Sequence, residues 1–226
     1  AAHNFGFSNT THAKGSKGEI GGNIIRSAKG LTYYASTIDG KTYSLNTLLN
    51  SSGKFNLTNT ESSSGVVFGW FDNKERGVWP PKNSIVVALS GESTYADVII
   101  SYGTSAGSTG HLDTGFDVNE STIHNYTLTY DPNYNSGNGA VIFVLDNNSP
   151  KILNLTNGHK AQGAALNRYG MTNLEADGNP MGIYFDDLVI NSVLYNFSSE
   201  PGNWEWQGYG NRQNFTECEA NNFGWK

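Results

Sequence analysis

The chain has 226 residues and a formal net charge of −6, and 15% of its residues are charged, against roughly 25% in an average soluble protein. It contains no run of basic residues, so we expect no nucleic-acid binding. No apolar run approaches the ~18 residues of a membrane-spanning helix, so we expect no membrane insertion. The hydrophobic residues, 37% of the chain, are enough to fill the core of one large domain.

Short β-rich runs alternate along the chain with clusters of Gly, Asn, Asp and Ser, and helical periodicity is almost absent. The predicted strands are 20–26, 31–35, 42–49, 53–58, 65–71, 84–89, 96–102, 124–130, 140–145, 151–155 and 182–190. Large residues alternate in 125–130, which predicts one buried face. The run 85–89 is apolar throughout, which is typical of a central strand covered on both sides.

Strands of this number and spacing predict an all-β fold, a two-sheet antiparallel β-sandwich of the jelly-roll type, over residues 1–195. Residues 196–226 form a separate C-terminal arm with many Asn, Gly and aromatic residues. We expect this arm to complete either its own module or a neighbouring one.

The composition also indicates where the protein works. A polar but weakly charged surface is typical of extracellular β proteins, so we expect a secreted or cell-surface location. The start Ala1-Ala2-His3 is interpreted as a processed end or as the start of a fragment. Cys218 is the single cysteine, so no intrachain disulfide is expected. It is either a half-buried small residue or one half of an interchain disulfide.

Several short segments occur in a characteristic order over residues 5–190. They are Phe5-Gly6-Phe7-Ser8 followed by His12, Gly18-Glu19-Ile20-Gly21-Gly22, Tyr33-Tyr34-Ala35, Phe68-Gly69-Trp70-Phe71, Tyr130-Asp131-Pro132, Gly158-His159-Lys160-Ala161 and Tyr184-Phe185-Asp186-Asp187-Leu188. In this order they resemble bacterial secreted and surface modules with the concanavalin A-like (laminin G-like) jelly-roll fold. The resemblance implies the fold, but this fold hosts lectins, hydrolases, lyases and inert spacers alike.

One segment departs from the family order. The stretch Pro201-Gly202-Asn203-Trp204-Glu205 through Asn211-Arg212 resembles a segment that precedes Phe5-Gly6-Phe7-Ser8 in the family, and here it lies at the C-terminus. We therefore consider two arrangements, a circular permutant in which the arm folds back and a linking arm that inserts into the next copy. The candidate anchors of the assembly arm are Trp204, Trp206, Tyr209, Phe215, Phe223 and Trp225.

No catalytic pair stands out in the predicted strands. Glycoside hydrolases on this fold need two carboxylates beside the scissile bond, and no strand carries alternating Glu and Asp. Asp186 and Asp187 are adjacent, so we expect them on opposite faces. The strand motifs of alginate-lyase-like jelly rolls are not found either. We therefore expect a protein that is not an enzyme, with a polysaccharide hydrolase or lyase as an alternative.

Six charged residues form a candidate polar cluster in an otherwise weakly charged chain. They are His12, Glu19, Arg26, His159, Lys160 and Arg168. The favoured interpretation is structural, with Glu19 paired to Arg26 or Arg168 and with His159 and Lys160 bonded to loop carbonyls. The alternative is a general acid–base site or a clamp for a sugar carboxylate.

Two aromatic residues are candidate sugar platforms. Trp79 lies in a rigid Trp-Pro-Pro loop and Tyr134 in a predicted hairpin, whereas Trp70 lies in an apolar strand and is expected in the core. The same hairpin places Asp131, Asn133 and Asn135 at calcium-loop spacing, but its twelfth position is Ile142 where a Glu is needed. An Asx-rich hairpin is therefore favoured, no cofactor is expected, and Ca²⁺ is the alternative.

The most numerous motif is Asn-X-Ser/Thr, which occurs nine times, a modest excess for this composition. The candidate glycosylation sites are Asn9, Asn50, Asn56, Asn119, Asn125, Asn147, Asn154, Asn196 and Asn214. The alternative is that the source does not glycosylate asparagine and the motifs are compositional.

Three functions follow from these features. The first is a structural module of an extracellular filament, sheath or adhesin stalk, glycosylated and joined head-to-tail to further copies of itself through the arm. The second is a lectin-like carbohydrate-binding module that binds glycans through loop aromatics. The third is a polysaccharide hydrolase or lyase that uses Glu19, His159 and Lys160.

Overall fold

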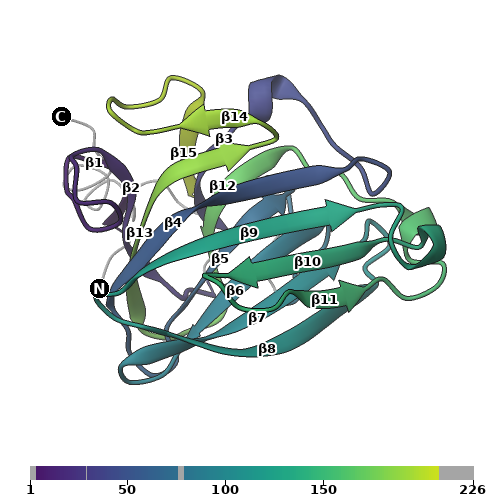
Figure 1. The fold of residues 1–226 in the computed structure, drawn as a ribbon, viewed down its shortest axis with the longest axis horizontal. Helices are drawn as coiled ribbons and strands as arrows, with labels where there is room; N and C mark the ends of the chain where they lie inside the picture. Colours follow the sequence, from purple (N-terminus) through teal and green to yellow (C-terminus); the bar gives the residue numbers. More distant parts are fainter. Residues whose placement is uncertain (1–3, 29, 76–78, 209–226) are drawn as a thin grey trace.

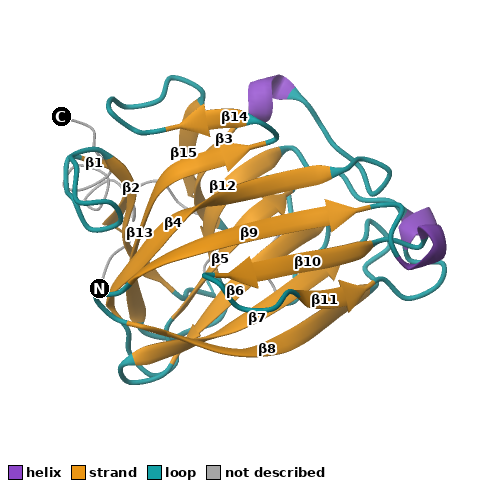
Figure 2. Cartoon of the chain, in the orientation of Figure 1, coloured by secondary structure: helices purple, strands orange, loops and turns teal. Residues whose placement is uncertain are grey.

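The computed structural model describes the chain apart from residues 1–3, 29, 76–78 and 209–226. The described residues form strands and three 3₁₀ turns (Figures 1 and 2). The strands are β1 (Asn4–Ser8), β2 (Glu19–Ile25), β3 (Thr32–Ser36), β4 (Leu49–Asn59), β5 (Gly65–Phe71), β6 (Ser84–Gly91), β7 (Tyr95–Gly103), β8 (Thr109–Asn119), β9 (Ile123–Asp131), β10 (Ala140–Leu145), β11 (Lys151–Asn154), β12 (Arg168–Asn173), β13 (Pro180–Ile190), β14 (Val193–Tyr195) and β15 (Trp204–Gly208). The 3₁₀ turns are η1 (Ile38–Gly40), η2 (Asn135–Gly137) and η3 (Lys160–Gln162).

The strands build two sheets, which we call sheet A and sheet B. Sheet A has eight strands in the order β1-β2-β13-β4-β9-β10-β11, with β14 added to β13, and sheet B has seven in the order β15-β3-β12-β5-β6-β7-β8. Figure 1 shows β4, β9 and β10 of sheet A in front of β5, β6 and β7 of sheet B. The paired strands are antiparallel throughout, so the predicted concanavalin A-like jelly roll is confirmed. Among the described residues, no helix is long and apolar enough to cross a membrane.

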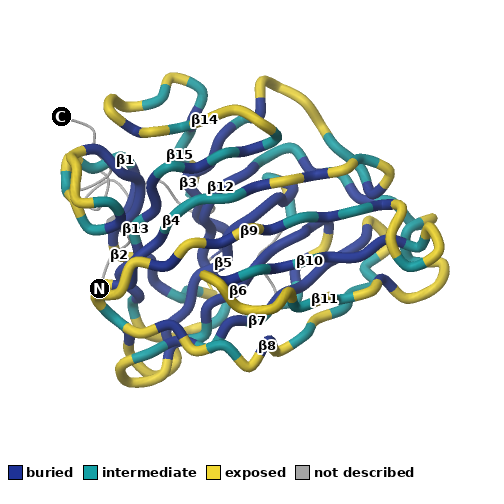
Figure 3. The backbone as a smooth tube through the Cα atoms, in the orientation of Figure 1, coloured by how far each residue is buried: buried dark blue, intermediate teal, exposed yellow. Residues whose placement is uncertain are grey.

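The core lies between the two sheets and is rich in aromatic rings. Phe68 of sheet B contacts Tyr126 and Phe185 of sheet A, with ring centroids 5.1 Å and 5.0 Å away. Trp70 is fully buried, as its apolar strand predicts, and its ring meets Tyr169 edge-on. Strands β5 and β6 are buried on both faces along most of their length (Figure 3), which confirms the prediction for apolar runs.

Several predicted boundaries are wrong. The strand expected over 42–49 is absent, and only an isolated bridge from Tyr43 to Leu166 forms there. The strand expected over 53–58 is instead part of β4, which begins at Leu49. Strands β8 and β12 were not predicted, because β8 is an edge strand with many exposed polar residues and β12 carries a central glycine, Gly170. Strands β1, β14 and β15 are also additional to the prediction.

The described part of the C-terminal arm folds back onto its own domain. Strand β15 pairs with β3 and forms one edge of sheet B. The Trp204 side chain is buried in the core, where its ring contacts Tyr34, Tyr195 and Phe197. Trp204 and Trp206 are therefore not intermolecular anchors in this structure, which corrects that prediction. Tyr209, Phe215, Phe223, Trp225 and Cys218 lie outside the described residues.

Candidate functional site

The outer face of sheet B is the surface that gathers polar groups beside a pocket. Alternation along β5 sends Val66, Phe68 and Trp70 into the core, and it sends Val67 and Phe71 to the outer face. This outer face is apolar at its centre, so the chain covers it with its own loops. One of these loops, which links β5 to β6, carries Trp79, which packs against the cluster of Val67, Val86, Ala88 and Leu174.

A pocket with an empty volume of about 330 Å³ opens on this face. Its lining residues, which we call the sheet B pocket, are Leu31, Val67, Phe71, Asp72, Glu75, Pro81, Lys82, Val86, Thr172 and Asn173. The floor is therefore apolar, and the rim carries two carboxylates and one ammonium. The half-buried Trp79 packs against the cluster of Val67, Val86, Ala88 and Leu174, two of which line the pocket, but Trp79 is not itself a lining residue.

Polar residues from three adjacent strands and one loop form a network beside the pocket, which we call the Tyr33 network. Its members are Tyr33, Asn73, Arg168, Glu205 and Gln207. The Tyr33 hydroxyl lies 2.8 Å from Glu205 Oε1 and also reaches Gln207 Oε1, while Arg168 Nε donates to Glu205 Oε1 over 2.7 Å. The ring of Tyr33 contacts that of Phe71 at 5.4 Å, which links this network to the pocket floor.

The electrostatics of the network favour hydrogen bonding over proton transfer. Burial, and then the hydrogen bond to Glu205, raise the pKa of Tyr33 to about 12, so its hydroxyl stays protonated at neutral pH. Arg168 is held by Glu205 on one side and by the carbonyl of Asn167 on the other. Both side chains therefore have fixed hydrogen-bond partners.

The pocket rim is held by local hydrogen bonds. Asp72 accepts from the backbone N–H of Lys74 and from the side chain of Asn167. Glu75 accepts from the side-chain amide of Asn83 over 2.9 Å. These bonds order the start and the end of the loop that carries Trp79, whose middle residues 76–78 lie outside the described part of the chain.

The predicted polar cluster does not form one site. Glu19 pairs with neither Arg26 nor Arg168, which corrects that expectation, because its carboxylate accepts the backbone N–H groups of His12 and Ala13 over 2.8 Å and 2.7 Å. Arg168 lies on sheet B in the Tyr33 network. Arg26 donates to the carbonyl of Ser63. Long-range packing, which no local pattern encodes, therefore separates the six residues.

The other two members of that cluster lie in the segment after β11. His159 Nδ1 lies 2.9 Å from the hydroxyl of Tyr102, where a loop carbonyl was expected. Lys160 donates to the carbonyls of Pro132 and Gly137 over 2.7 Å and 3.0 Å, as expected for a structural lysine. The ammonium of Lys160 thus binds the carbonyls of the hairpin that contains Asp131, Asn133 and Asn135, the residues for which Ca²⁺ was the alternative ligand. Tyr134 is exposed in the same loop, which connects β9 to β10 of sheet A, so it does not belong to the sheet B pocket.

The calcium-loop residues have structural partners of their own. Asp131 Oδ1 accepts the backbone N–H of Asn133 over 2.8 Å, which is an Asx turn. Asn135 begins η2 and directs its amide towards the carbonyl of Leu155. In the described ranges, no group of three His, Cys, Asp or Glu side chains is arranged to hold a metal ion.

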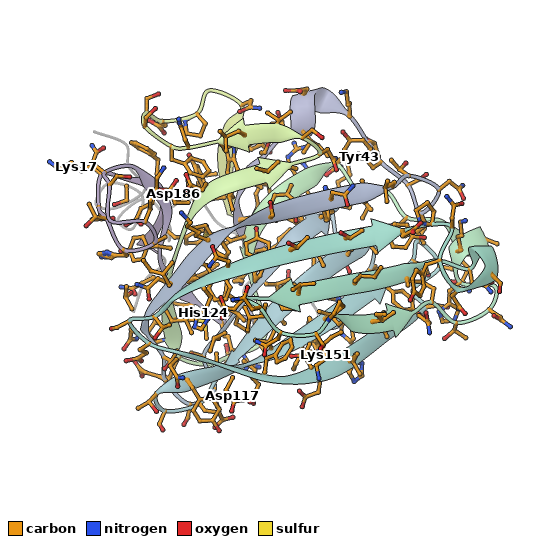
Figure 4. All side chains as sticks on the ribbon, viewed as in Figure 1. Lys17, Tyr43, Asp117, His124, Lys151 and Asp186 are labelled. Carbon is orange, nitrogen blue, oxygen red and sulfur yellow. The ribbon has the colours of Figure 1, made fainter. Side chains whose placement is uncertain are left out.

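A second polar group lies on the outer face of sheet A, under the loop of residues 9–18. Asp186 is fully buried and one of its carboxylate oxygens, Oδ2, lacks a hydrogen-bond partner. Figure 4 shows it next to the loop that carries Lys17. Burial raises the pKa of Asp186 to about 6. Hydrogen bonds from Lys14 and Lys54 hold the pKa of Asp187 below its usual value, against the effect of burial.

Asp186 and Asp187 are not on opposite faces, which corrects the expectation from strand alternation. Lys14 Nζ lies 3.9 Å from Asp186 Oδ2 and also bonds Asp187 Oδ1. The pairing of β13 with β4 shifts register between Asp186 and Val189, and Asp187 has a φ of 51°. This bulge rotates the second carboxylate back towards the first. The group has no pocket among the described cavities, so we treat it as a structural anchor for the loop.

Seven of the nine candidate glycosylation sites are exposed: Asn9, Asn50, Asn119, Asn125, Asn147, Asn154 and Asn196. Asn56 is buried and its Nδ2 donates to the carbonyl of His12, so it is unsuitable as an acceptor, which corrects that prediction. Asn214 lies outside the described residues.

Sequence reasoning missed most of the Tyr33 network and of the pocket rim. Glu205 and Gln207 alternate with Trp204 and Trp206, so a period-two pattern typical of a strand with one polar face was present, although no strand was predicted there. No comparable signal connects that strand to Tyr33, because the two lie about 170 residues apart in the chain, with a separation of 172 from Tyr33 to Glu205.

No family model and no curated protein matches the chain. Among solved structures, an alginate lyase from Pseudomonas aeruginosa matches with a TM-score of 0.44 and 10% identity over 65% of this chain and 65% of that one. An alginate lyase from Klebsiella pneumoniae matches with a TM-score of 0.43 and 9% identity, over 66% of this chain and 59% of that one. A peanut lectin matches with a TM-score of 0.39 and 12% identity, over 85% of this chain and 91% of that one. The match thus spans less than two thirds of either lyase, and at such scores these likenesses assign no function.

Proposed function

We propose that the protein is a carbohydrate-binding module and that sugars bind on the outer face of sheet B. The observation that carries this proposal is the sheet B pocket, which has an apolar floor and charged side chains at its rim, together with a half-buried indole packed against the adjoining apolar cluster. Ligand sites typically combine an apolar lining with a small number of polar groups.

The chemistry of the rim suits a sugar ring. Carboxylates such as those of Asp72 and Glu75 bind hydroxyl groups, because each oxygen can accept a hydrogen bond in a fixed direction. A pyranose also has an apolar face of C–H groups, and Trp79 offers an aromatic surface beside the pocket. Lys82 adds one cation at the rim.

Binding is favoured over catalysis because Tyr33 and Arg168, which lie beside the pocket, are both already hydrogen-bonded to Glu205. Tyr33, with a pKa raised to about 12, is a poor base at neutral pH. Arg168 is already paired with Glu205. We therefore propose a binding protein rather than a hydrolase or lyase.

The same proposal places the module outside the cell, in keeping with its weakly charged surface and its exposed sequons. Assembly through the C-terminal arm is not the function proposed here, since the described part of that arm pairs with β3 of its own chain.

The test is binding to a panel of neutral and acidic polysaccharides by affinity electrophoresis, followed by calorimetry on any ligand found. Trp79→Ala and Lys82→Ala should each weaken binding by about tenfold or more, which corresponds to 1.4 kcal/mol or more. Lys82 is exposed, so that variant tests the site without disturbing the fold.

Tyr134→Ala is the matched control, because Tyr134 is an exposed aromatic residue in the loop between β9 and β10. It should leave the affinity unchanged. Loss of binding in Tyr134→Ala with full binding in the two pocket variants would place the site elsewhere. Absence of binding to every polysaccharide would overturn the proposed function.

A further inference from the structure

Most of the large exposed aliphatic side chains in the described part of this protein occupy the same position relative to a sequon. Among the described residues, Leu48, Ile123, Ile152 and Leu194 are 55%, 43%, 38% and 61% exposed. Each lies two positions before the asparagine of a sequon. The four pairs are Leu48 with Asn50, Ile123 with Asn125, Ile152 with Asn154 and Leu194 with Asn196. The remaining large exposed hydrophobic residues are Val193, next to Leu194, and Tyr134.

In β9 and β11 the spacing of two puts both members of a pair on the same side of the strand, whereas Leu48 lies just before β4 and Asn196 just after β14. In β9, His124 and Tyr126 are buried, while Ile123 and Asn125 are exposed. In β11, Ile152 and Asn154 are the two exposed positions. Side chains i and i+2 of a strand lie next to each other on one face. A sugar attached to the asparagine therefore lies beside the aliphatic side chain.

The pairing makes physical sense only when something covers the aliphatic groups. An exposed Ile or Leu gains roughly 25 cal/mol for each Å² of apolar surface removed from water. The C–H face of a pyranose ring is a suitable cover, and a ring linked to Asn125 Nδ2 is already held close to Ile123.

We propose that Asn50, Asn125, Asn154 and Asn196 carry N-linked oligosaccharides, and that the first sugar of each packs over the aliphatic side chain two residues earlier. This inference is independent of the carbohydrate-binding proposal, because it concerns sugars attached to the protein rather than sugars bound by it.

The attachment step requires a lipid-linked oligosaccharide phosphate or pyrophosphate donor and the transferase of the host. The amide nitrogen of the asparagine attacks the anomeric carbon of the first sugar. A carbon–nitrogen bond forms there, the bond from that carbon to the phosphate oxygen breaks, and the lipid phosphate leaves. The amide nitrogen loses one proton, so charge and atoms balance.

The structure also supplies an internal negative. Asn56 has the sequon pattern, but it is buried, its Nδ2 donates to the carbonyl of His12, and the residue two positions earlier is Lys54, which pairs with Asp187. We therefore expect Asn56 to be unmodified in the same protein molecules in which the four exposed asparagines are modified.

The four proposed sites all belong to sheet A. Asn50 and Asn125 lie in β4 and β9, Asn154 ends β11, and Asn196 follows β14. The sheet B pocket lies on the other sheet. Glycans at these positions would cover one face of the sandwich and leave the proposed binding face open.

The first experiment is glycopeptide mass spectrometry on the protein isolated from its source. Sugars at Asn50, Asn125, Asn154 and Asn196, together with bare Asn56, are the expected result. Bare asparagine at all four positions would overturn the proposal. Full occupancy of Asn56 would also contradict it, because that residue cannot be modified in the described fold.

The second experiment tests the packing of the first sugar. The purified glycoprotein is trimmed either to one sugar per site or to none, and Tm is measured for both forms. The one-sugar form should retain the higher Tm, and Ile123→Ser together with Ile152→Ser should reduce the difference between the two forms.

Asn147 is the matched control site. It is exposed, but it lies in the turn between β10 and β11 and the residue two positions earlier, Leu145, is buried. Asn147→Gln should leave the Tm difference unchanged. Equal Tm values for the one-sugar and sugar-free wild-type forms would refute the packing contact, whatever the occupancy.

Discussion

The ammonium nitrogen of Lys14 lies 3.9 Å from a carboxylate oxygen of the fully buried Asp186. This distance is too long for a hydrogen bond, and that oxygen, Oδ2, has no other partner. The groups that surround Asp186 are Glu19 of β2, Asp187 of its own strand and Lys14 of the covering loop. Burial and the two carboxylates outweigh the attraction of Lys14, so the proton of Asp186 is held more tightly than in an exposed residue.

This relationship predicts that stability falls as the pH rises from about 4 to about 6. The pKa of Asp186 is raised from 3.8 to about 6 in the folded state, so the folded protein binds more protons in that window. The stabilisation is fully present at a pH below the pKa of Asp186 in the unfolded state. It is lost as the pH rises past the pKa of Asp186 in the folded state. Its size is on the order of 3 kcal/mol, since one pKa unit corresponds to about 1.4 kcal/mol.

Urea unfolding at a series of pH values measures the effect. Asp186→Asn should flatten the profile between pH 4 and 6, because the amide does not titrate. The pKa of Asp187 is lowered in the folded state, so its contribution to stability is lost as the pH falls, and only at a pH below this window. An unchanged profile in Asp186→Asn would assign the pH dependence to another group.

Glu19 holds the loop of residues 9–18 on sheet A. Its two carboxylate oxygens each accept one backbone N–H, from His12 and Ala13. Glu19→Gln keeps one acceptor and leaves one buried N–H unpaired, at a cost of about 1–3 kcal/mol. Amide hydrogen exchange should accelerate at His12 and Ala13. Glu61→Gln, at an exposed position, is the control and should change neither stability nor exchange in this loop.

Trp204 should be essential for the folded monomer. It is buried among Tyr34, Tyr195 and Phe197, and replacing a buried Trp by Ala typically costs about 3–5 kcal/mol. Urea unfolding of Trp204→Ala at low protein concentration measures this loss. A variant with wild-type stability would show that β15 does not complete its own sheet, and the linking-arm hypothesis would then return.

Lys160 should stabilise the loop between β9 and β10 in place of a bound metal. Its ammonium donates to the carbonyls of Pro132 and Gly137, so Lys160→Met leaves two oxygens without this cation. We expect a loss of about 1–2 kcal/mol. Addition of Ca²⁺ should change Tm neither in the wild type nor in the variant. A rise in wild-type Tm with Ca²⁺ would support the calcium-loop interpretation of Asp131, Asn133 and Asn135.

The chain's own pattern determined the fold class and much of the core. The apolar run 65–71 is strand β5, and Trp70 is in the core, because periodicity and burial follow from residues that are neighbours in the chain. The exposure of the aliphatic residue two positions before a sequon is also a local property in β9, since alternation with the buried His124 and Tyr126 fixes it.

Only the tertiary structure decided which distant groups meet. The bulge that brings Asp187 back towards Asp186 depends on how β13 pairs with β4, and the burial of Asn56 depends on the loop above it. Glu205 meets Tyr33 because β15 returns to pair with β3 and becomes the edge strand of sheet B. The hydrogen bonds among these contacts join residues 44 and 172 positions apart, and no local pattern of side chains specifies the register that creates them.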